Sequence, residues 1–370
     1  MLFLKLTTLF FTLMLFFQNA YASEMPQDEL LKKMIGRMLI VGFDGQSVTK
    51  DSQIVKQIQK YHLGGIILFD RHFNERTKTK NISSPSQLKT LTSSLKSFAL
   101  KPLLISVDQE GGKVARLKSA YGFEATPSAK IVSEMDAYMA KRIYDNLAKT
   151  LKDAGINCNF APVVDLAVNP QNRVIAGLKR SYSNEPKEVT KYAKIFMNSL
   201  RDKNIISVIK HFPGHGSSLE DSHNGFVDIS KTWSEIELEP YIELIHSGDA
   251  DMIMTAHVFN SNLDELYPST LSYKANTELL RDKLGYKGVI VSDDLQMGAI
   301  AKHYTLEQIV TLSINSGVDM LLFGNQLSYQ NSDELVETIL AQVKNGAIPL
   351  SRILESNSRV EQLFTKIKIK

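Results

Sequence analysis

Short apolar runs alternate with longer amphipathic stretches along nearly the whole chain. The runs are almost continuously hydrophobic, which is typical of strands that are buried on both faces of a parallel sheet. They occupy residues 38–43, 64–69, 103–108, 159–166, 206–212, 252–258, 288–294 and 320–324. Eight such strands separated by helices predict a single (β/α)8 TIM barrel. A doubly wound open sheet is the alternative, because hydrophobic periodicity does not reveal whether a sheet closes.

The stretches between the apolar runs have the periodicity of amphipathic helices, most clearly at residues 137–155, 188–204 and 275–285. Two further helical segments, 333–346 and 350–367, follow the eighth run. They leave no room for a second hydrophobic core, so we expect residues 23–370 to form one barrel domain.

The N-terminal residues 1–22 are predicted to be a signal peptide rather than part of the fold. An apolar run from Leu6 to Phe17 is followed by Ala20-Tyr21-Ala22 and then Ser23. This small-x-small pattern is typical of a secretory signal that is cleaved after Ala22. An uncleaved anchor is the alternative, but the run is short for a span of about 20 residues.

Charge and cysteine content narrow the possible classes of protein. The chain has 43 basic and 40 acidic residues, a net charge of +3. So balanced a chain gives no argument for binding nucleic acid or an acidic membrane surface. The single cysteine, Cys158, excludes an intrachain disulfide. It lies within a strand-like run, where a buried thiol behaves as a small hydrophobic group rather than as a nucleophile.

Polar residues lie at the ends of several of the apolar runs. They are Asp108, Asp165, Lys210, His211, His257, Asp293 and Asp294. Polar groups are costly to bury without partners, and active sites in barrels gather at the carboxyl ends of the strands. The pattern therefore predicts a functional site at that end of the barrel.

Three of the eight histidines lie in the segment KHFPGHGSSLEDSH, residues 210–223. A zinc site would draw its ligands from His211, His215, Asp221 and His223. However, Pro213 and Gly214 interrupt the helical face that a pair of histidines four residues apart needs. We therefore expect no metal. A solvated polar loop is the other ordinary interpretation.

Asp221-Ser222-His223 favours proton transfer instead. A carboxylate beside an imidazole orients the ring and raises its pKa, so that the ring can protonate a leaving oxygen and later deprotonate water. Asp293, at the end of a buried strand in GVIVSDDLQM, is placed to act as a nucleophile. Together they would supply the two parts of retaining glycoside hydrolysis. Asp294 is the better candidate for a helix cap.

Side chains suited to sugar hydroxyls complete the predicted site. Carboxylates accept hydrogen bonds from hydroxyls, while Arg and Lys donate them. The candidates are Asp108, Arg116, Arg180, Lys210 and His211. Taken singly, each could equally belong to a surface ion pair.

The motifs DQEGGKVARL, NFAPVVDL, KRSYS, KHFPGHGSSLEDSH and GVIVSDDLQM occur in this order. In the identity and order of these motifs, the chain resembles the glycoside hydrolase family 3 β-N-acetylhexosaminidases. The resemblance implies a cofactor-free retaining exo-enzyme that removes terminal β-linked N-acetylglucosamine, typically from peptidoglycan fragments. It further implies that Asp293 is the nucleophile, His223 the acid/base and Asp221 its orienting partner. The sugar-binding positions correspond to Asp108, Arg116, Arg180, Lys210 and His211.

The predicted signal peptide departs from the pattern of this family, because Gram-negative relatives that recycle the cell wall usually work in the cytoplasm. Export would place the protein beside the wall, and we expect a periplasmic location. Intact glycan ends or periplasmic fragments would then be its substrates.

Three alternatives remain open. A family 3 β-glucosidase resembles a two-domain chain whose acid/base comes from the second domain, and the DSH motif argues against it. A phosphorylase is possible because a histidine acid/base repels an anionic nucleophile less than a carboxylate does. A non-catalytic glycan-binding barrel would be expected to have lost Asp221, His223 or Asp293, all of which are present.

Overall fold

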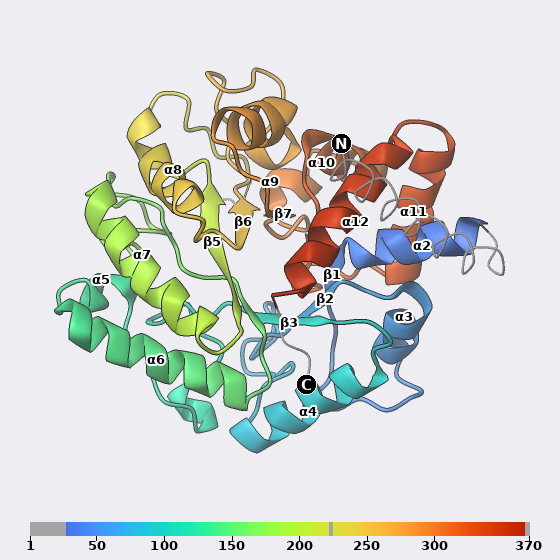
Figure 1. The fold of residues 1–370 in the computed structure, drawn as a ribbon, viewed down its shortest axis with the longest axis horizontal. Coiled ribbons are helices and arrows are strands. Elements are labelled where there is room, and N and C mark those ends of the chain that lie inside the picture. Colours follow the sequence, from blue (N-terminus) through green and yellow to red (C-terminus); the bar gives the residue numbers. More distant parts are fainter. Residues whose placement is uncertain (1–26, 222–224, 367–370) are drawn as a thin grey trace, which may run out of the picture.

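Eight parallel strands form the centre of the computed structural model, which describes residues 27–221 and 225–366 (Figure 1). The strands are β1 (Leu39–Gly42), β2 (Gly65–Ile67), β3 (Leu104–Val107), β4 (Cys158–Asn159), β5 (Ile206–Phe212), β6 (Met252–Thr255), β7 (Val289–Ser292) and β8 (Leu321–Phe323). Each strand from β1 to β6 pairs in parallel with the next one, and β1 also pairs with β8.

The sheet closes between β7 and β8. The carbonyl of Ile290 accepts hydrogen bonds from the backbone N–H groups of Asp319 and Met320, and Ser292 donates to the carbonyl of Met320 over 3.0 Å. The prediction of a (β/α)8 barrel is therefore confirmed, and the open-sheet alternative is excluded.

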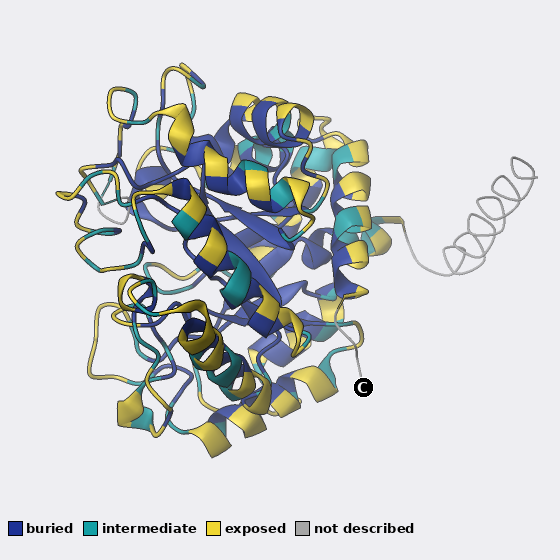
Figure 2. Ribbon diagram, turned by 60° about the vertical axis from the view of Figure 1, so that its left-hand side comes forward, coloured by how far each residue is buried: buried dark blue, intermediate teal, exposed yellow. Residues whose placement is uncertain are grey.

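Helices surround the strands, with one face of each helix exposed to solvent and the other buried (Figures 1 and 2). The longer ones are α2 (Gln27–Arg37), α3 (Gln53–Tyr61), α4 (Pro85–Phe98), α6 (Ala137–Asp153), α7 (Pro186–Arg201), α8 (Glu239–His246), η4 (Lys274–Lys283), α10 (Leu306–Ser316), α11 (Ser332–Lys344) and α12 (Leu350–Phe364). Short turns complete the set: η1 (Ser119–Tyr121), α5 (Ala129–Val132), η2 (Glu235–Leu238), η3 (Ser269–Leu271) and α9 (Gly298–Ala301). Within the described residues, no helix is both long and apolar enough to cross a bilayer.

Local sequence accounts for where these helices begin, end and pack. In α6, Asp136 accepts a hydrogen bond from the N–H of Met139 over 2.8 Å and so caps the first turn. Tyr144, Leu147 and Leu151 are buried on one face of the same helix, at the spacing that an amphipathic helix requires. The helix ends at Asp153, two residues before Gly155.

Two large hydrophobic cores hold the fold together, and a small cluster of Val227, Ile229, Ala256 and Val258 lies beside them. The larger lies between the strands and the helices, and the smaller fills the barrel, with Ile40, Leu104, Val208, Met254 and Val291 among its members. The C-terminal helix α12 contributes Val360, Leu363 and Phe364 to the inner core. Cys158 is fully buried there as a free thiol, and burial raises its pKa. This agrees with the expectation of an inert small side chain.

The fourth strand is much shorter than predicted. The run 159–166 reads as a buried strand, but regular pairing ends at Asn159. Pro162 has no N–H to donate to the ladder. The side chain of Asn159 bonds the backbone of Gln109 in both directions, over 2.9 and 3.0 Å. The chain rejoins β5 through a bridge between Val163 and Lys210.

Candidate active site

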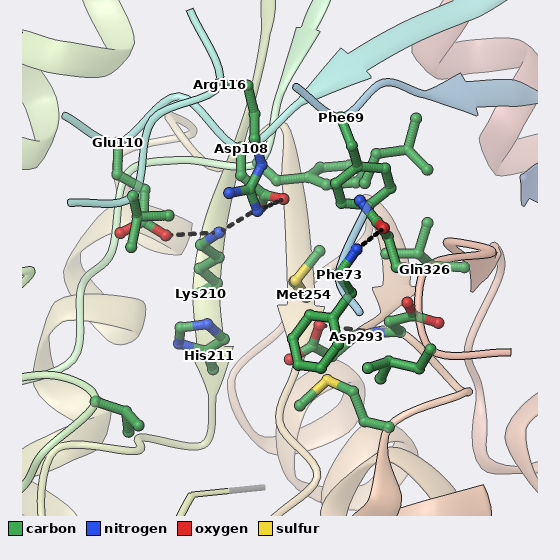
Figure 3. Close-up of a pocket in the computed structure, with 18 of the residues that line it drawn as sticks. Phe69, Phe73, Asp108, Glu110, Arg116, Lys210, His211, Met254, Asp293 and Gln326 are labelled. Carbon is green, nitrogen blue, oxygen red and sulfur yellow. Dashed lines mark hydrogen bonds and ion pairs between the residues drawn. The ribbon is translucent and has the colours of Figure 1, made fainter. Parts of the chain in front are cut away.

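A pocket of about 330 Å³ opens at the carboxyl ends of the strands (Figure 3). Seven of the eight residues predicted for the site line it: Asp108, Arg116, Arg180, Lys210, His211, Asp221 and Asp293. The eighth, His223, lies outside the described residues. The tertiary structure thus brings together groups from β5 and from the loops that follow β3, β4, β5 and β7.

A network of alternating charges forms one wall of the pocket. Lys210, from β5, contacts Asp108 at 3.0 Å and Glu110 at 2.8 Å. Arg116 donates to the second oxygen of Asp108 over 3.1 Å. Arg180 binds both oxygens of Glu110 at 2.7 Å, the bidentate geometry that suits a guanidinium and a carboxylate. In this network each carboxylate therefore contacts two cations.

This network keeps both carboxylates ionised. Burial by itself would raise the pKa of Glu110, but the charges of Arg180 and Lys210 outweigh it and lower that pKa to about 2. Burial likewise opposes ionisation of Asp108, and Lys210 and Arg116 together lower its pKa. The wall consequently presents fixed acceptors and fixed donors over a wide pH range.

His211 extends the network through a buried aspartate. Its Nδ1 lies 2.6 Å from Asp165, a carboxylate that is ionised because the neighbouring His211 outweighs the effect of burial on its pKa. Since a carboxylate only accepts, Nδ1 carries the proton of this bond. Nη2 of Arg180 lies 3.3 Å from Nε2 of the same ring.

The first part of the 210–223 segment is held in place on several sides. Asp165 accepts from the N–H of His215 over 2.8 Å, and Asn172 donates to the carbonyls of His215 and Gly216. Glu237, on η2, accepts from the N–H of Gly216 over 2.9 Å. These bonds anchor the stem that leads to Asp221 at the pocket.

Asp293 follows directly after β7. Val289 and Val291 point into the barrel, and Asp293 continues this alternation at the pocket. Its N–H donates to the carbonyl of Thr255 on β6 over 3.3 Å, and its carboxylate accepts from the N–H of Asp294 over 2.8 Å. A rigid strand end therefore positions this carboxylate.

Asp294 does not cap a helix, contrary to expectation. Its Oδ1 accepts from the N–H groups of Gln296 and Gly324 over 3.1 and 3.2 Å, and α9 begins only after Met297. Five residues separate the strand from the helix, so Asp294 instead fastens this turn to the loop that follows β8.

The described histidines of the 210–223 segment are bonded to other side chains. Among the described residues, no group of three or more His, Cys, Asp or Glu side chains could hold a metal ion. His211 is bonded to Asp165, and Nδ1 of His215 lies 2.7 Å from Ser218.

Three residues in or next to the pocket were not among the predicted site residues. Glu110 lies in the DQEGG motif, but it is not at the end of a strand, which was the signal used to predict site residues. Asp165 was recognised only as a strand-end residue, and its contact with His211 spans 46 residues. Phe73 lies in a polar stretch, 71–80, that carries no periodic signal. Each is recognisable only from the closed barrel.

Glu237 makes the stability of the fold depend on pH. Burial raises its pKa to about 7, so between pH 4.5 and 7 the folded chain holds a proton that the unfolded chain has lost. Stability that depends on this proton is lost as the pH rises through that window. Between pH 5 and pH 8 we expect the thermal midpoint of the wild type to fall by roughly 3 °C relative to Glu237→Gln. Equal shifts in both proteins would contradict the assignment.

The model of the family described as "Glycosyl hydrolase family 3 N terminal domain" matches residues 30–363. The chain belongs to glycosyl hydrolase family 3. The family resemblance inferred from the motifs is thereby confirmed.

Individual proteins that are similar to this chain have names that agree with the family assignment. "Beta-hexosaminidase A" of Pseudoalteromonas piscicida is 30% identical, covering 96% of this chain and 64% of the relative. "Beta-hexosaminidase" of Tolumonas auensis is 35% identical, covering 76% of this chain and 81% of the relative. The structure of a family 3 beta-N-acetylglucosaminidase from Paenibacillus superposes with a TM-score of 0.82 at 33% identity, covering 91% of this chain.

The family 3 chain spans less than two thirds of two of these proteins, 64% of the Pseudoalteromonas relative and 62% of the Paenibacillus structure. Several relatives at 30–35% identity are named β-hexosaminidase.

Proposed function

We propose that the protein is a retaining exo-β-N-acetylglucosaminidase. The observation that carries the proposal is the carboxylate of Asp293, which lines one pocket together with the alternating network of Asp108, Glu110, Lys210 and Arg180. Charge-paired donors and acceptors can orient a sugar, while the carboxylate at the strand end can attack it.

In the proposed reaction, the carboxylate of Asp293 attacks the anomeric carbon as the bond to the leaving oxygen breaks. His223 donates its proton to that oxygen, and a glycosyl–Asp293 ester forms. His223 then takes a proton from water as the water oxygen attacks the same carbon and releases Asp293. Two inversions preserve the β configuration. Asp221 orients His223 and favours its protonated form.

The terminal sugar would be bound by Asp108, Arg116, Arg180, Lys210 and His211. Asp108 supplies acceptors for hydroxyl groups, and the cations supply donors. Because the network is assembled among the protein's own groups, little reorganisation is needed when a sugar binds.

Trapping of the intermediate tests this mechanism. A fluorinated N-acetylglucosaminyl donor that slows deglycosylation should label Asp293, as detected by peptide mass spectrometry. NMR of the first product formed from a β-linked substrate should show the β anomer. Label on another residue, or an initial α product, would refute the scheme.

Phosphate decides between hydrolysis and phosphorolysis. We expect the free sugar to be the main product in phosphate-containing and phosphate-free buffer alike. N-acetylglucosamine 1-phosphate as the main product would instead make the protein a phosphorylase. Binding of N-acetylglucosaminides without turnover between pH 5 and pH 8 would indicate a glycan-binding barrel.

We further propose that the natural substrates are peptidoglycan fragments or related glycans, encountered after export to the periplasm. The signal-like pattern of residues 1–22 supports export. Mass spectrometry of products released from purified peptidoglycan fragments tests the substrate, and cell fractionation tests the location.

Glu110→Gln should show how far the site depends on its ion pairs. The substitution removes a buried charge that contacts Arg180 and Lys210, so the two cations would repel one another and shift. We expect kcat/KM to fall by roughly 10²-fold, since small displacements of binding groups are costly, and the thermal midpoint to fall as well.

Asp153→Asn is the matched control, because it breaks an exposed pair with Lys149 on α6. Surface pairs contribute little, so both measurements should stay at wild-type values. A lower midpoint with unchanged kcat/KM in Glu110→Gln would make Glu110 purely structural.

A further inference from the structure

The stem of the 210–223 segment, residues 213–218, is buried and is bonded to two other parts of the chain. One is the loop after β4, and the other is η2. Beyond the stem, Leu219 and Glu220 are exposed, and Asp221 lines the pocket. The stem therefore determines the point from which the exposed part of the segment reaches the pocket.

Asn172, in the loop after β4, is buried and uses both ends of its side-chain amide. Its Nδ2 donates to the carbonyls of His215 and Gly216 over 2.8 and 3.1 Å. Its Oδ1 accepts from the N–H groups of Val174 and Ile175 over 2.9 and 2.7 Å. One side chain thus joins the stem to the turn formed by residues 172–175.

This turn leads into the wall that we assign to the terminal sugar. Val174 lines the pocket, and its carbonyl accepts from Nη1 of Arg180 over 3.2 Å. Arg180 in turn binds both oxygens of Glu110. Asn172 consequently connects the sugar-binding wall with the stem of the segment that carries the predicted acid/base.

Glu237 bonds the stem from a second element, η2. Its Oε2 accepts from the N–H of Gly216 over 2.9 Å, while Asn172 bonds the carbonyl of the same glycine. A Cβ added to Gly216 would lie 1.8 Å from the carbonyl oxygen of Leu166. A Cβ added to Gly214 would lie 2.7 Å from Cβ of Glu237. The stem is therefore packed against both elements with no space for a side chain at either glycine.

We propose that Asn172 and Glu237 form a clamp that positions the acid/base end of the 210–223 segment for protonation of the leaving oxygen. The inference rests on the proposed hydrolase function, in which His223 is the acid/base. A general acid works only within hydrogen-bond reach of the oxygen that it protonates. The attacking Asp293 follows a different strand, β7. Loosening the clamp should therefore weaken proton transfer far more than nucleophilic attack.

Asn172→Asp separates the two functions of the amide. The retained Oδ1 can still accept from Val174 and Ile175, whereas the second carboxylate oxygen has no proton to give the carbonyls of His215 and Gly216. We expect kcat/KM for β-linked di-N-acetylglucosamine to fall by roughly 10²-fold, since small displacements of catalytic groups are costly. A dinitrophenyl glycoside needs little protonation, so its kcat/KM should fall far less.

Glu237 provides a conservative variant and a disruptive one. Glu237→Gln keeps an oxygen that can accept from Gly216, so the ratio of kcat/KM between the two substrates should stay at the wild-type value. Glu237→Ala removes that oxygen and should shift the ratio in the same direction as Asn172→Asp. Over a series of aryl glycosides, rates should depend more steeply on the pKa of the phenol in Glu237→Ala than in Glu237→Gln.

Asn157→Asp is the matched control. Asn157 is also a buried asparagine, whose Oδ1 accepts from the N–H of Ile105 over 2.6 Å and whose Nδ2 donates to the carbonyl of Leu103 over 2.9 Å. It lies just before β4, at the amino ends of the strands and so away from the pocket. The substitution breaks the same kind of bond, so the thermal midpoint should fall. Both substrates should nevertheless change by the same factor.

The ratio of the two kcat/KM values does not depend on the fraction of enzyme that is folded, so partial unfolding of a variant leaves it unchanged. Equal losses on both substrates in Asn172→Asp and Glu237→Ala would overturn the clamp and make both residues purely structural. In that case His223→Ala would still discriminate between leaving groups, and trapping would still label Asp293. Failure of the hydrolase proposal is a separate result, in which the wild type cleaves neither substrate.

Discussion

Asp293→Ala is expected to abolish nearly all turnover while the barrel stays folded. Removing the attacking carboxylate eliminates the covalent route, so we expect kcat to fall by roughly 10⁴-fold or more. The loss should appear equally with aryl glycosides and natural disaccharides, because both pass through the same ester. Circular dichroism and the thermal midpoint would establish that the variant folds.

Chemical rescue makes this prediction specific. With the side chain of Asp293 truncated, azide can occupy the space and attack the anomeric carbon of an activated aryl glycoside in one displacement, expelling the phenolate. The product would be the α-glycosyl azide, identified by NMR. The neighbouring Asp294→Asn is the control, since its retained Oδ1 can still accept from Gln296 and Gly324. A greater loss in Asp294→Asn than in Asp293→Ala would exchange the two roles.

His223→Ala should produce the second large effect, and its size should depend on the leaving group. A natural sugar leaves as a poor alkoxide unless it is protonated, so we expect a loss of roughly 10²- to 10⁴-fold with disaccharides. A nitrophenolate needs little protonation, and the first step with that substrate should lose far less. Rates with a series of aryl glycosides should consequently become steeply dependent on the pKa of the phenol.

A substitution of Asp221 can be compared with His223→Ala, because Asp221 is proposed to orient His223. Asp221→Asn retains the volume of the side chain but removes the charge proposed to favour protonated His223. The acidic form of the histidine should then be lost at lower pH, and the basic limb of the rate profile should move down. Equal losses on good and poor leaving groups in His223→Ala would remove His223 from the acid role.

The strands were largely predictable because burial on both faces leaves a strong local signal. The run 206–212 coincides with β5. Each of the other predicted runs overlaps its strand, but the strand is shorter than the run. The exception is 159–166, where hydrophobicity persists after pairing stops at Asn159. Hydrophobicity reports burial, whereas pairing also needs an N–H at the right place, which Pro162 lacks.

The candidate site was predictable in part for the same reason. Strand ends marked Asp108, Lys210, His211 and Asp293, and all four line the pocket. Glu110 and Phe73 were missed, and Asp165 was recognised only as a strand-end residue, because their partners are remote in the chain. Phe73, for example, is held by Gln326, 253 residues away.

By itself, the sequence determined the alternation of strands and helices, the end of the barrel at which polar groups collect and the motifs of family 3. These depend on periodicity and on residues adjacent in the chain. Only the tertiary structure decided which charges meet: closing the barrel brings Lys210 within 3.0 Å of Asp108, 102 residues earlier, and Arg180 onto Glu110, 70 residues earlier. The physical reason is that buried charges need partners, and the partners available are set by neighbouring strands rather than by neighbouring residues.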